Sequence, residues 1–385
     1  MNFFEHISYR MNSHKKNIIM ICIDGCRSDR AKNSKIFTDY LPGTNFCSQS
    51  ITYAPYTNSS IYAVFSGAYG NRNGCFSYWH SLKFKNDKFK TITKYLAEQN
   101  YYTHADVHSK LALPISEFEK FEIYDEKSSD LISRHKNLIK LMKTKFSKDQ
   151  NFFLYLHYEK IHTGIVNSVL KSYTNFSEEY FKNKDKNEER YNKLFKESEA
   201  YLKNILDEIN FQGLTTDTLI IIFSDHGISL GEKVGERAYG AFCYDYTIKT
   251  FCSFIATELQ SQFITQQIRH VDLLPSIIDF LGIPFDEKFS HFDGKSIIPL
   301  FYNKKIPEEI AFTETANPLL EKIPPKKPNT KSVRTSNWKL IFNEYDDTKE
   351  LYNLKDDPEE LNNLVGTGLE IENKLWNEFL NLQQK

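Results

Sequence analysis

The sequence predicts an α/β protein in which a large, mainly parallel sheet lies between helices, and in which the chain ends with antiparallel strands. Short apolar runs typical of strands buried on both faces recur along the chain, at residues 17–23, 152–156 and 218–223. Longer segments with helical periodicity lie between and beside them, at residues 91–99, 131–145 and 188–209. Strands that alternate with helices in this way form right-handed βαβ units, whose strands run parallel.

The pattern changes near the C-terminus. A proline-rich segment at residues 323–328 interrupts the alternation. After it, residues 331–343 and 350–353 predict a hairpin of antiparallel strands, and residues 358–364 predict the start of a final helix. The last part of the chain is therefore expected to form a structure separate from the parallel sheet.

The composition bears on the class of protein. The 385 residues include 49 Lys and Arg against 50 Asp and Glu, so no net positive field indicates a nucleic-acid partner. Residues 1–16 lack the hydrophobic region of a signal peptide, and no apolar stretch approaches the roughly 18 residues of a membrane span. The six cysteines form no CxxC pair, and we expect Cys22 and Cys252 to be reduced core thiols. We therefore expect a cytoplasmic protein without an integral membrane segment, and its oligomeric state stays open.

Two of the predicted buried strands end in residues that can bind metal. Asp225 and His226 follow the run 218–223, and Asp24 follows the run 17–23. If the two strands are neighbours in one sheet, these side chains converge at its carboxyl edge, where open α/β sheets place their chemistry. Carboxylates and an imidazole suit one divalent cation. Taken singly, each of these residues could equally belong to a turn or a helix N-cap.

Thr57 is the candidate nucleophile. It stands before a short apolar stretch that predicts a helix closed by Ser66 and Gly67. A hydroxyl at that helix start faces backbone N–H groups and the positive end of the helix dipole. Coordination to a cation lowers the pKa of a hydroxyl and makes the alkoxide accessible. The alternative is that Thr57, Ser59 and Ser60 only cap the helix.

With these residues in place, the sequence resembles the sulfatase family of the alkaline phosphatase superfamily. The resemblance extends from Ile18 to about Leu364 and rests on ordered blocks. These blocks are residues 21–30 (ICIDGCRSDR), 65–74 (FSGAYGNRNG), 152–162 (FFLYLHYEKIH), 224–227 (SDHG) with 231–232 (GE), 269–276 (RHVDLLPS), 293–296 (DGKS) and 350–359 (ELYNLKDDPE). The resemblance implies an alkaline-phosphatase-like fold in three parts: an N-terminal extension (1–16), a catalytic domain (17–310) and a small C-terminal subdomain (311–385).

The sequence departs from the family at the nucleophile. True sulfatases carry a Cys or Ser, in Cys/Ser-x-Pro-x-Arg, that is converted to formylglycine. Here Thr57 stands at the cysteine position, Ser59 at the proline and Ile61 at the arginine. A threonine resembles the phosphoethanolamine and phosphoglycerol transferases and the phosphodiesterases of the superfamily, in which the hydroxyl attacks phosphorus. The resemblance therefore implies a metal-dependent hydrolase or transferase of phosphate esters, with a phosphodiester as the favoured substrate.

The resemblance also assigns roles to single residues. Gly25 stands where sulfatases often have a second acidic ligand. The implied ligands are therefore Asp24, Thr57, Asp225 and His226, for one ion of Mn²⁺, Zn²⁺, Mg²⁺ or Ca²⁺. A second metal is the less favoured alternative, and His270 is interpreted as structural.

Accessory roles fall mainly on histidines near strand ends. His162 is expected to neutralise charge in the transition state or to protonate the leaving oxygen. His157 is expected to form hydrogen bonds behind the ligands. For Arg27 and Asp29, a salt-linked turn and a catalytic role are equally open. The expected substrate contacts are His108, Lys110, Arg237 and Tyr239.

Two alternatives remain beside a phosphate esterase. One is a sulfuric ester hydrolase that lacks formylglycine, and the other is a catalytically inactive binding protein with the same fold. The expected substrate is a small-molecule or glycan phosphate or sulfate ester. The sequence leaves open which ester it is and whether water or an alcohol accepts the transferred group.

Overall fold

The structure is a computed structural model of the 385-residue chain. It describes residues 16–77, 80, 82–114, 118–146, 150–172, 175–176, 180, 182–233, 238–316 and 326–384.

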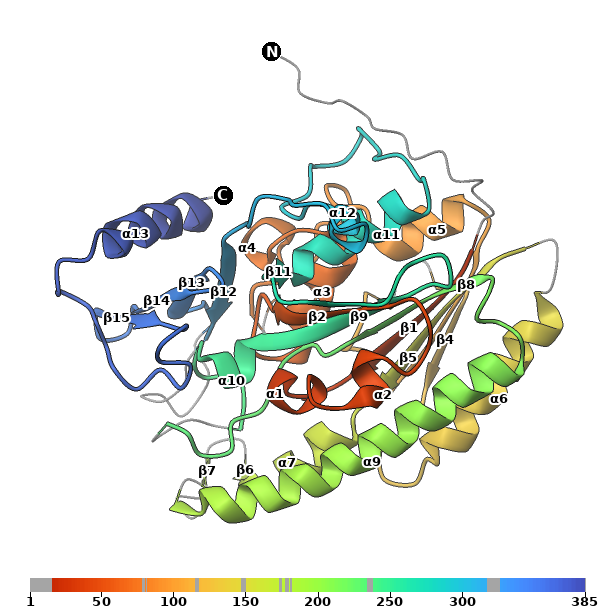
Figure 1. Ribbon diagram of the computed structural model, residues 1–385, viewed down its shortest axis with the longest axis horizontal. Coiled ribbons are helices and arrows are strands. Elements are labelled where there is room, and N and C mark those ends of the chain that lie inside the picture. Colours follow the sequence, from red (N-terminus) through yellow and green to blue (C-terminus); the bar gives the residue numbers. More distant parts are fainter. Residues whose placement is uncertain are drawn as a thin grey trace.

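A mixed, mostly parallel sheet forms the centre of the molecule (Figure 1). Within the described residues its strand order is β10-β2-β9-β8-β1-β5-β3-β4, and β11 also pairs with β2. β9 runs antiparallel to both of its neighbours, and all other pairings are parallel. The strands are β1 (Asn17–Ile23), β2 (Thr44–Ile51), β3 (Tyr102–Val107), β4 (Lys120–Ile123), β5 (Phe152–Tyr158), β8 (Thr218–Phe223), β9 (Lys249–Ile255), β10 (Gln262–Ile264) and β11 (Ile268–Arg269). The predicted mainly parallel sheet is confirmed.

The central strands are buried on both faces. Every residue of β1, β5 and β8 is buried, as the unbroken apolar runs predict. β1 lies between the other two, with Ile21 opposite Leu156 on one side and Ile222 on the other. This register brings the carboxyl ends of β1 and β8 to the same edge of the sheet.

Helices cover both faces of the sheet (Figure 1). The long helix α9 (Lys184–Phe211) lies below it in this view. It packs there with α6 (Leu131–Lys145), α7 (Lys160–Val169) and α2 (Lys35–Thr38), and α1 (Ser28–Ala31) lies close by. The opposite face carries α3 (Thr57–Ser66), α4 (Gly70–Asn73), α5 (Ile92–Glu98), α11 (Leu273–Phe280) and α12 (Ile298–Phe301). The side chains of β1 accordingly divide between two apolar clusters, with Ile19 and Ile21 in one and Ile18 and Met20 in the other.

A separate antiparallel sheet follows, at the left of Figure 1. It contains β12 (Ala311–Thr315), β13 (Thr330–Arg334), β14 (Trp338–Asn343) and β15 (Thr348–Asn353), and α13 (Glu370–Gln383) packs on it. The smaller elements are α10 (Asp245–Ile248), a 3₁₀ turn at His270–Asp272 and a ribbon of β6 (Leu170–Ser172) and β7 (Asn175–Phe176). The antiparallel C-terminal structure is confirmed, while its boundary at residue 310 stays a prediction.

The predicted start of the final helix is wrong, because residues 358–364 form turns. The Asp357 carboxylate accepts hydrogen bonds from the backbone N–H groups of Leu361 and Asn362. Glu360 has φ +58°, in the left-handed region that an α-helix excludes. Local side-chain bonds of this kind compete with helix formation, and the helix begins only at Glu370.

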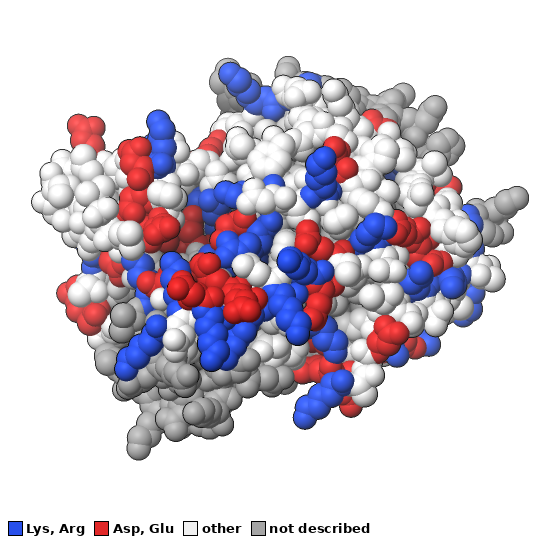
Figure 2. Space-filling model, turned by 60° about the horizontal axis from the view of Figure 1, so that its bottom comes forward, with Lys and Arg blue, Asp and Glu red and all other residues white. Residues whose placement is uncertain are grey.

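The distribution of surface charge and the state of the cysteines are as the composition predicts. Figure 2 shows the lower face of Figure 1, where positive and negative side chains are interspersed. All six cysteines are free and buried. Among the described helices, none combines the length and the apolar character that a membrane span requires.

Candidate active site

The two strand ends meet as the sequence predicts. Asp24 follows β1 and Asp225 follows β8, and both side chains are buried. The backbone N–H of Gly25 donates to Asp225 Oδ1 over 3.3 Å. Asp24, Asp225 and His226 therefore share one pocket at the carboxyl edge of the sheet.

Gly25 explains why no second acidic residue follows Asp24. Its φ is +73°, which disfavours side chains. A Cβ atom there would also lie 2.6 Å from Cδ1 of Ile228. The backbone and the packing together leave this position to glycine.

Thr57 begins α3, and this helix is buried along its whole length. The helix ends at Gly67, which has φ +64°, as the sequence predicts. The Thr57 hydroxyl donates to Asp24 Oδ2 over 3.3 Å, and the residue is 7% exposed. α3 begins at this place, and a helix N-terminus favours an anion.

Ile61 lies one turn further along α3. It is fully buried in an apolar cluster, at the position where the family carries an arginine. An aliphatic side chain there cannot hold a charged or hydrated group beside Thr57.

The orientation of His226 is fixed by its neighbour. Its Nδ1 lies 2.7 Å from the carbonyl oxygen of Gly227, which can only accept, so Nδ1 carries the proton and Nε2 keeps a lone pair. That lone pair lies 3.4 Å from Asp24 Oδ1 and 3.7 Å from Asp225 Oδ2. Neither Nε2 of His226 nor Oδ2 of Asp225 has a hydrogen-bond partner in the described part of the chain.

This arrangement fits a divalent cation. Three acceptor atoms that face one another in a buried pocket repel unless a positive charge lies between them. Burial and the charge of Asp24 raise the pKa of Asp225, which is the expected result of placing two carboxylates together. With the Thr57 hydroxyl the pocket offers two carboxylates, one imidazole and one alcohol, a donor set suited to Mn²⁺, Zn²⁺ or Mg²⁺.

Two further histidines contact Asp24. Its Oδ1 lies 2.9 Å from Nδ1 of His162, and its Oδ2 lies 3.1 Å from Nε2 of His157. Burial acts to raise the pKa of Asp24, but the imidazoles of His162 and His157 outweigh it and hold this pKa well below its usual range. Asp24 is therefore an anion whose two oxygens each have a fixed partner.

Two groups of side chains have ligand atoms close enough together for one metal ion: Asp24 with His162 and His226, and Asp24 with His108 and His157. Both ring nitrogens of His157 already have partners, Asp24 on one side and the Tyr155 hydroxyl, 3.1 Å away, on the other. Of the ring nitrogens of His108 and His157, Nδ1 of His108 is the one that is buried without a partner among the described residues. This group has one ligand atom without a partner among the described residues, whereas Asp225 and His226 contribute two.

The predicted substrate contacts have different positions. Tyr239 stacks on His226 with ring centroids 4.9 Å apart and lies 4.6 Å from the His162 ring, so it covers the pocket. The His108 ring lies 4.8 Å from that of His157. Lys110 is exposed after β3, and no described contact joins it to the pocket. Arg237 lies outside the described residues.

The structure adds contacts that the sequence did not predict. Arg27 pairs with Asp29, as in a salt-linked turn, and also donates to Glu232 over 2.5 Å and to the carbonyl of Ile228 over 2.9 Å. Tyr155 orients His157. Such contacts depend on how neighbouring strands and loops align and on the rotamers of the side chains. No sequence motif predicts them.

His270 lies beneath the pocket. Its two ring nitrogens face the hydroxyls of Ser60, at 3.1 Å, and Thr250, at 2.9 Å. Burial lowers its pKa to about 3, so the ring is neutral. Ser60 in turn donates to the carbonyl of Asp225 over 2.7 Å, which fits a structural role for His270.

Comparisons with known proteins agree with this geometry. The family model for sulfatases matches residues 16–283. The model described as N-sulphoglucosamine sulphohydrolase, C-terminal, matches residues 242–385. The comparison with curated proteins gave no match.

Solved structures share the fold at low sequence identity. A putative sulfatase from Bacteroides thetaiotaomicron aligns with a TM-score of 0.74 and 14% identity, over 96% of this chain and 93% of its own. The phosphonate monoester hydrolase of Agrobacterium radiobacter aligns with a TM-score of 0.72 and 12% identity, over 96% of both chains. BT4656, solved with its substrate D-glucosamine-2-N,6-O-disulfate, aligns with a TM-score of 0.70 and 16% identity, over 96% of this chain and 97% of its own.

The sulfatase model spans more than half of the chain, and the residues at the strand ends lie together at the expected edge of the sheet. This protein therefore belongs to the sulfatase family, and it is an enzyme of that family.

Proposed function

We propose that this enzyme is a divalent-cation-dependent hydrolase or transferase of phosphate esters, with a phosphodiester as the favoured substrate and Thr57 as the nucleophile. The observation that carries the proposal is the contact of the Thr57 hydroxyl with Asp24, at the start of a buried helix. Threonine cannot be converted to formylglycine by the route that true sulfatases use, so its own hydroxyl is the available nucleophile.

The residues that would hold the cation are Asp24, Thr57, Asp225 and His226. When bound, a divalent cation lowers the pKa of a coordinated hydroxyl and neutralises charge on the ester oxygens. Asp24 is the central residue of this set, because it contacts Thr57 through one oxygen and faces His226 with the other.

The first half of the reaction forms a covalent intermediate. Oγ1 of Thr57, its proton lost to solvent, forms a bond to phosphorus, and the ester P–O bond breaks with its electron pair on the departing oxygen. His162 donates a proton to that oxygen. Burial opposes the charged form of this imidazole, but the Asp24 carboxylate outweighs it and raises the pKa of His162. The N–H groups at the start of α3 hydrogen-bond the remaining phosphate oxygens.

The second half restores the enzyme. Water, or the hydroxyl of an acceptor alcohol, attacks phosphorus in the phospho-threonine. The bond from phosphorus to Oγ1 breaks with its electron pair on Oγ1, which takes a proton back from solvent. His162, neutral after the first half, takes the proton of the attacking group. Hydrolase and transferase thus differ only in the acceptor that enters beside Tyr239 and His162.

A second candidate is a sulfuric ester hydrolase. It is favoured by the family match and by neighbours such as BT4656, whose substrate is a sulfated glucosamine. Sulfate and phosphate esters are tetrahedral oxyanions of similar size, and the same pocket can contact either. A small-molecule or glycan ester is the proposed substrate class, with His108, Lys110, Arg237 and Tyr239 as its proposed contacts.

Paired chromogenic esters separate the candidates. Bis-p-nitrophenyl phosphate, p-nitrophenyl phosphate and p-nitrophenyl sulfate are offered to the wild type and to Thr57→Ala, with Mn²⁺ or Zn²⁺ added. We expect cleavage of a phosphate ester by the wild type and loss of at least 10³-fold in kcat for Thr57→Ala, in the range found for loss of a catalytic group. Cleavage of the sulfate ester alone, or full activity of Thr57→Ala, would contradict the proposal. An inactive binding protein would bind no cation and cleave none of the three.

A further inference from the structure

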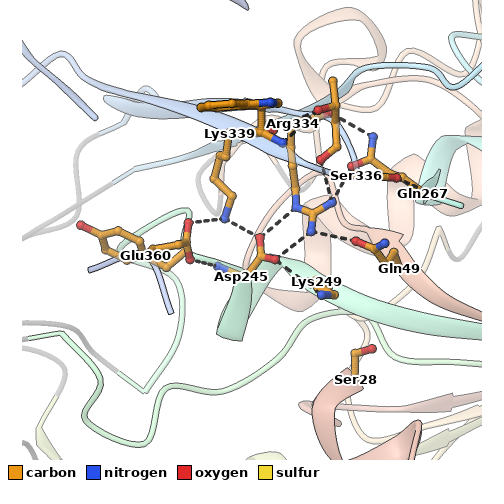
Figure 3. A network of polar contacts seen from close by, with 12 residues as sticks. Ser28, Gln49, Asp245, Lys249, Gln267, Arg334, Ser336, Lys339 and Glu360 are labelled. Carbon is orange, nitrogen blue, oxygen red and sulfur yellow. Dashed lines mark hydrogen bonds and ion pairs between the residues drawn. The ribbon is translucent and has the colours of Figure 1, made fainter. Parts of the chain in front are cut away.

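A buried cluster of charged side chains joins the C-terminal sheet to the segments behind the active site (Figure 3). We call Asp245, Arg334, Lys339 and Glu360 the joint. Arg334 and Glu360 are each 1% exposed, and Lys339 is fully buried. Buried charges need close partners of opposite sign, and the joint supplies two of each sign.

The contacts within the joint are short. Arg334 donates from Nε and Nη2 to the two oxygens of Asp245, over 2.9 and 2.8 Å. Lys339 Nζ lies 2.5 Å from Asp245 Oδ1 and 2.7 Å from Glu360 Oε1. The backbone N–H of Asp245 donates to Glu360 Oε2 over 2.7 Å. Glu360 therefore holds both the start of α10 and the lysine of β14.

A short path leads from the joint to the metal pocket. Asp245 begins α10, and Thr247 in the same turn accepts a hydrogen bond from the Gly227 N–H over 2.7 Å. Gly227 packs flush against this turn, because a Cβ atom there would lie 2.1 Å from the Tyr246 carbonyl oxygen. The carbonyl of Gly227 is the group that fixes the His226 ring. The position of α10 therefore fixes Gly227, and through the Gly227 carbonyl it fixes the direction in which the Nε2 lone pair of His226 points.

A second path leaves Glu360 through its backbone. The carbonyl of Glu360 accepts a hydrogen bond from Lys233 Nζ. The Lys233 ammonium also lies 4.7 Å from the Tyr244 ring centroid. Glu232, next to Lys233, accepts a hydrogen bond from Arg27. Arg27 lies three residues after Asp24 in the sequence. Both flanks of the pocket are therefore tied to one residue of the C-terminal structure.

The backbone of Glu360 supports a special role. Its φ of +58° is uncommon for a residue with a side chain, and such conformations persist where surrounding contacts require them. This conformation turns the carboxylate toward Asp245 while the carbonyl faces Lys233. A glycine would relieve the strain but would lose the carboxylate contacts.

We propose that Glu360 is a positioning residue of the active site, which acts through α10 and Gly227 to orient His226 for the cation. The inference rests on the proposed function, because it concerns the same pocket. It gives the C-terminal structure, through Glu360, a role in cation binding.

The test compares Glu360→Gln with Glu344→Gln. Glu344 follows β14, is exposed, and pairs with Lys331 of β13, so its loss serves as a control for removing one carboxylate from the C-terminal structure. In Glu360→Gln the amide can still accept from Asp245 but presents an NH₂ group to Lys339. We expect Mn²⁺ binding, measured by calorimetry on the metal-free protein, to weaken at least tenfold in Glu360→Gln, as for other groups that orient metal ligands, and to be unchanged in Glu344→Gln.

A second readout needs no cation. In metal-free protein labelled with ¹⁵N-histidine, the wild type and Glu344→Gln should show His226 as the Nδ1–H tautomer, and Glu360→Gln should show a mixture. Equal Mn²⁺ affinity and the same tautomer in Glu360→Gln would overturn the inference while leaving the proposed function intact. A wild type that binds no Mn²⁺ would overturn both.

Discussion

At the scale of single residues, the site is defined by acceptors that face one another. Asp24, Asp225 and His226 direct lone pairs into one buried space, and the Gly227 carbonyl prevents His226 from turning its N–H toward the carboxylates. Such a cluster is costly without a positive charge at its centre. The geometry of these three side chains is therefore the main physical reason to expect a cation.

His157 provides the first prediction at this scale. Its Nε2–H donates to Asp24 Oδ2, and the Tyr155 hydroxyl donates to its Nδ1, so the imidazole fixes one oxygen of the central ligand. We expect His157→Leu to weaken Mn²⁺ binding by about 10-fold to 100-fold, because it removes the imidazole that orients this oxygen. His157→Gln keeps an N–H donor and should lose less. Calorimetric titration with Mn²⁺ checks the expected order of affinities, which is wild type, then His157→Gln, then His157→Leu. A His157→Leu variant that binds Mn²⁺ as tightly as the wild type would contradict the prediction.

Much of the site could be predicted from the sequence. Asp24, Asp225 and His226 each follow an unbroken apolar run, and the ends of parallel neighbours meet at one edge. The contact of Asp24 with His157 could not be predicted as directly, because it depends on the rotamers of two buried side chains. The bond of Arg27 to Glu232 likewise depends on the path of a loop.

At the scale of elements, local chemistry decides where strands and helices begin and end. Gly67 ends α3 with a positive φ, so the helix that carries Thr57 could be bounded from the sequence. The final helix could not, because the Asp357 carboxylate holds the following N–H groups in a turn. The antiparallel direction of β9 could not be predicted either, because an apolar run does not indicate in which direction a strand runs.

Glu314 gives a prediction for the contact between β12 and the main domain. It is 4% exposed and accepts a hydrogen bond from the Tyr53 hydroxyl. Burial raises its pKa from 4.5 to about 7, so between these values the folded state holds a proton that the unfolded state has lost. The free energy of unfolding must therefore fall as pH rises through this window, by up to about 3 kcal/mol.

The test is urea unfolding at pH 5 and pH 8. Glu314→Gln cannot ionise, so its stability relative to the wild type should improve toward pH 8. Glu308→Gln serves as the control, because Glu308 is an exposed partner of Ser336 and should show no such trend. A Glu314→Gln variant whose difference from the wild type is the same at both pH values would contradict the assignment.

At the scale of the whole molecule, one pocket depends on segments from most of the chain. The ligands come from the ends of β1 and β8 and from α3, and the joint at Asp245 and Glu360 ties the C-terminal sheet to the turn behind them. A cation that binds only the folded state must stabilise all of these segments together.

Heat stability should therefore depend on the cation. At a Mn²⁺ concentration 100 times the dissociation constant, we expect about 2.7 kcal/mol of added stability and a rise of several degrees in Tm. Asp225→Asn removes one carboxylate from the pocket and should lose most of this rise as well as turnover. Differential scanning fluorimetry with and without Mn²⁺ checks the difference, and an equal rise in both proteins would place the cation elsewhere.

The most direct test of the central claim is to trap the covalent intermediate. The enzyme is mixed with p-nitrophenyl phosphate and Mn²⁺, quenched in acid within one turnover, digested and analysed by mass spectrometry. The account predicts a phosphoryl group on Thr57, in the peptide that begins α3, and no phosphoryl group on Thr57 in wild-type enzyme mixed without substrate. A phosphoryl group on another residue, or product formed in a burst with no modified Thr57, would contradict the claim that Thr57 is the nucleophile.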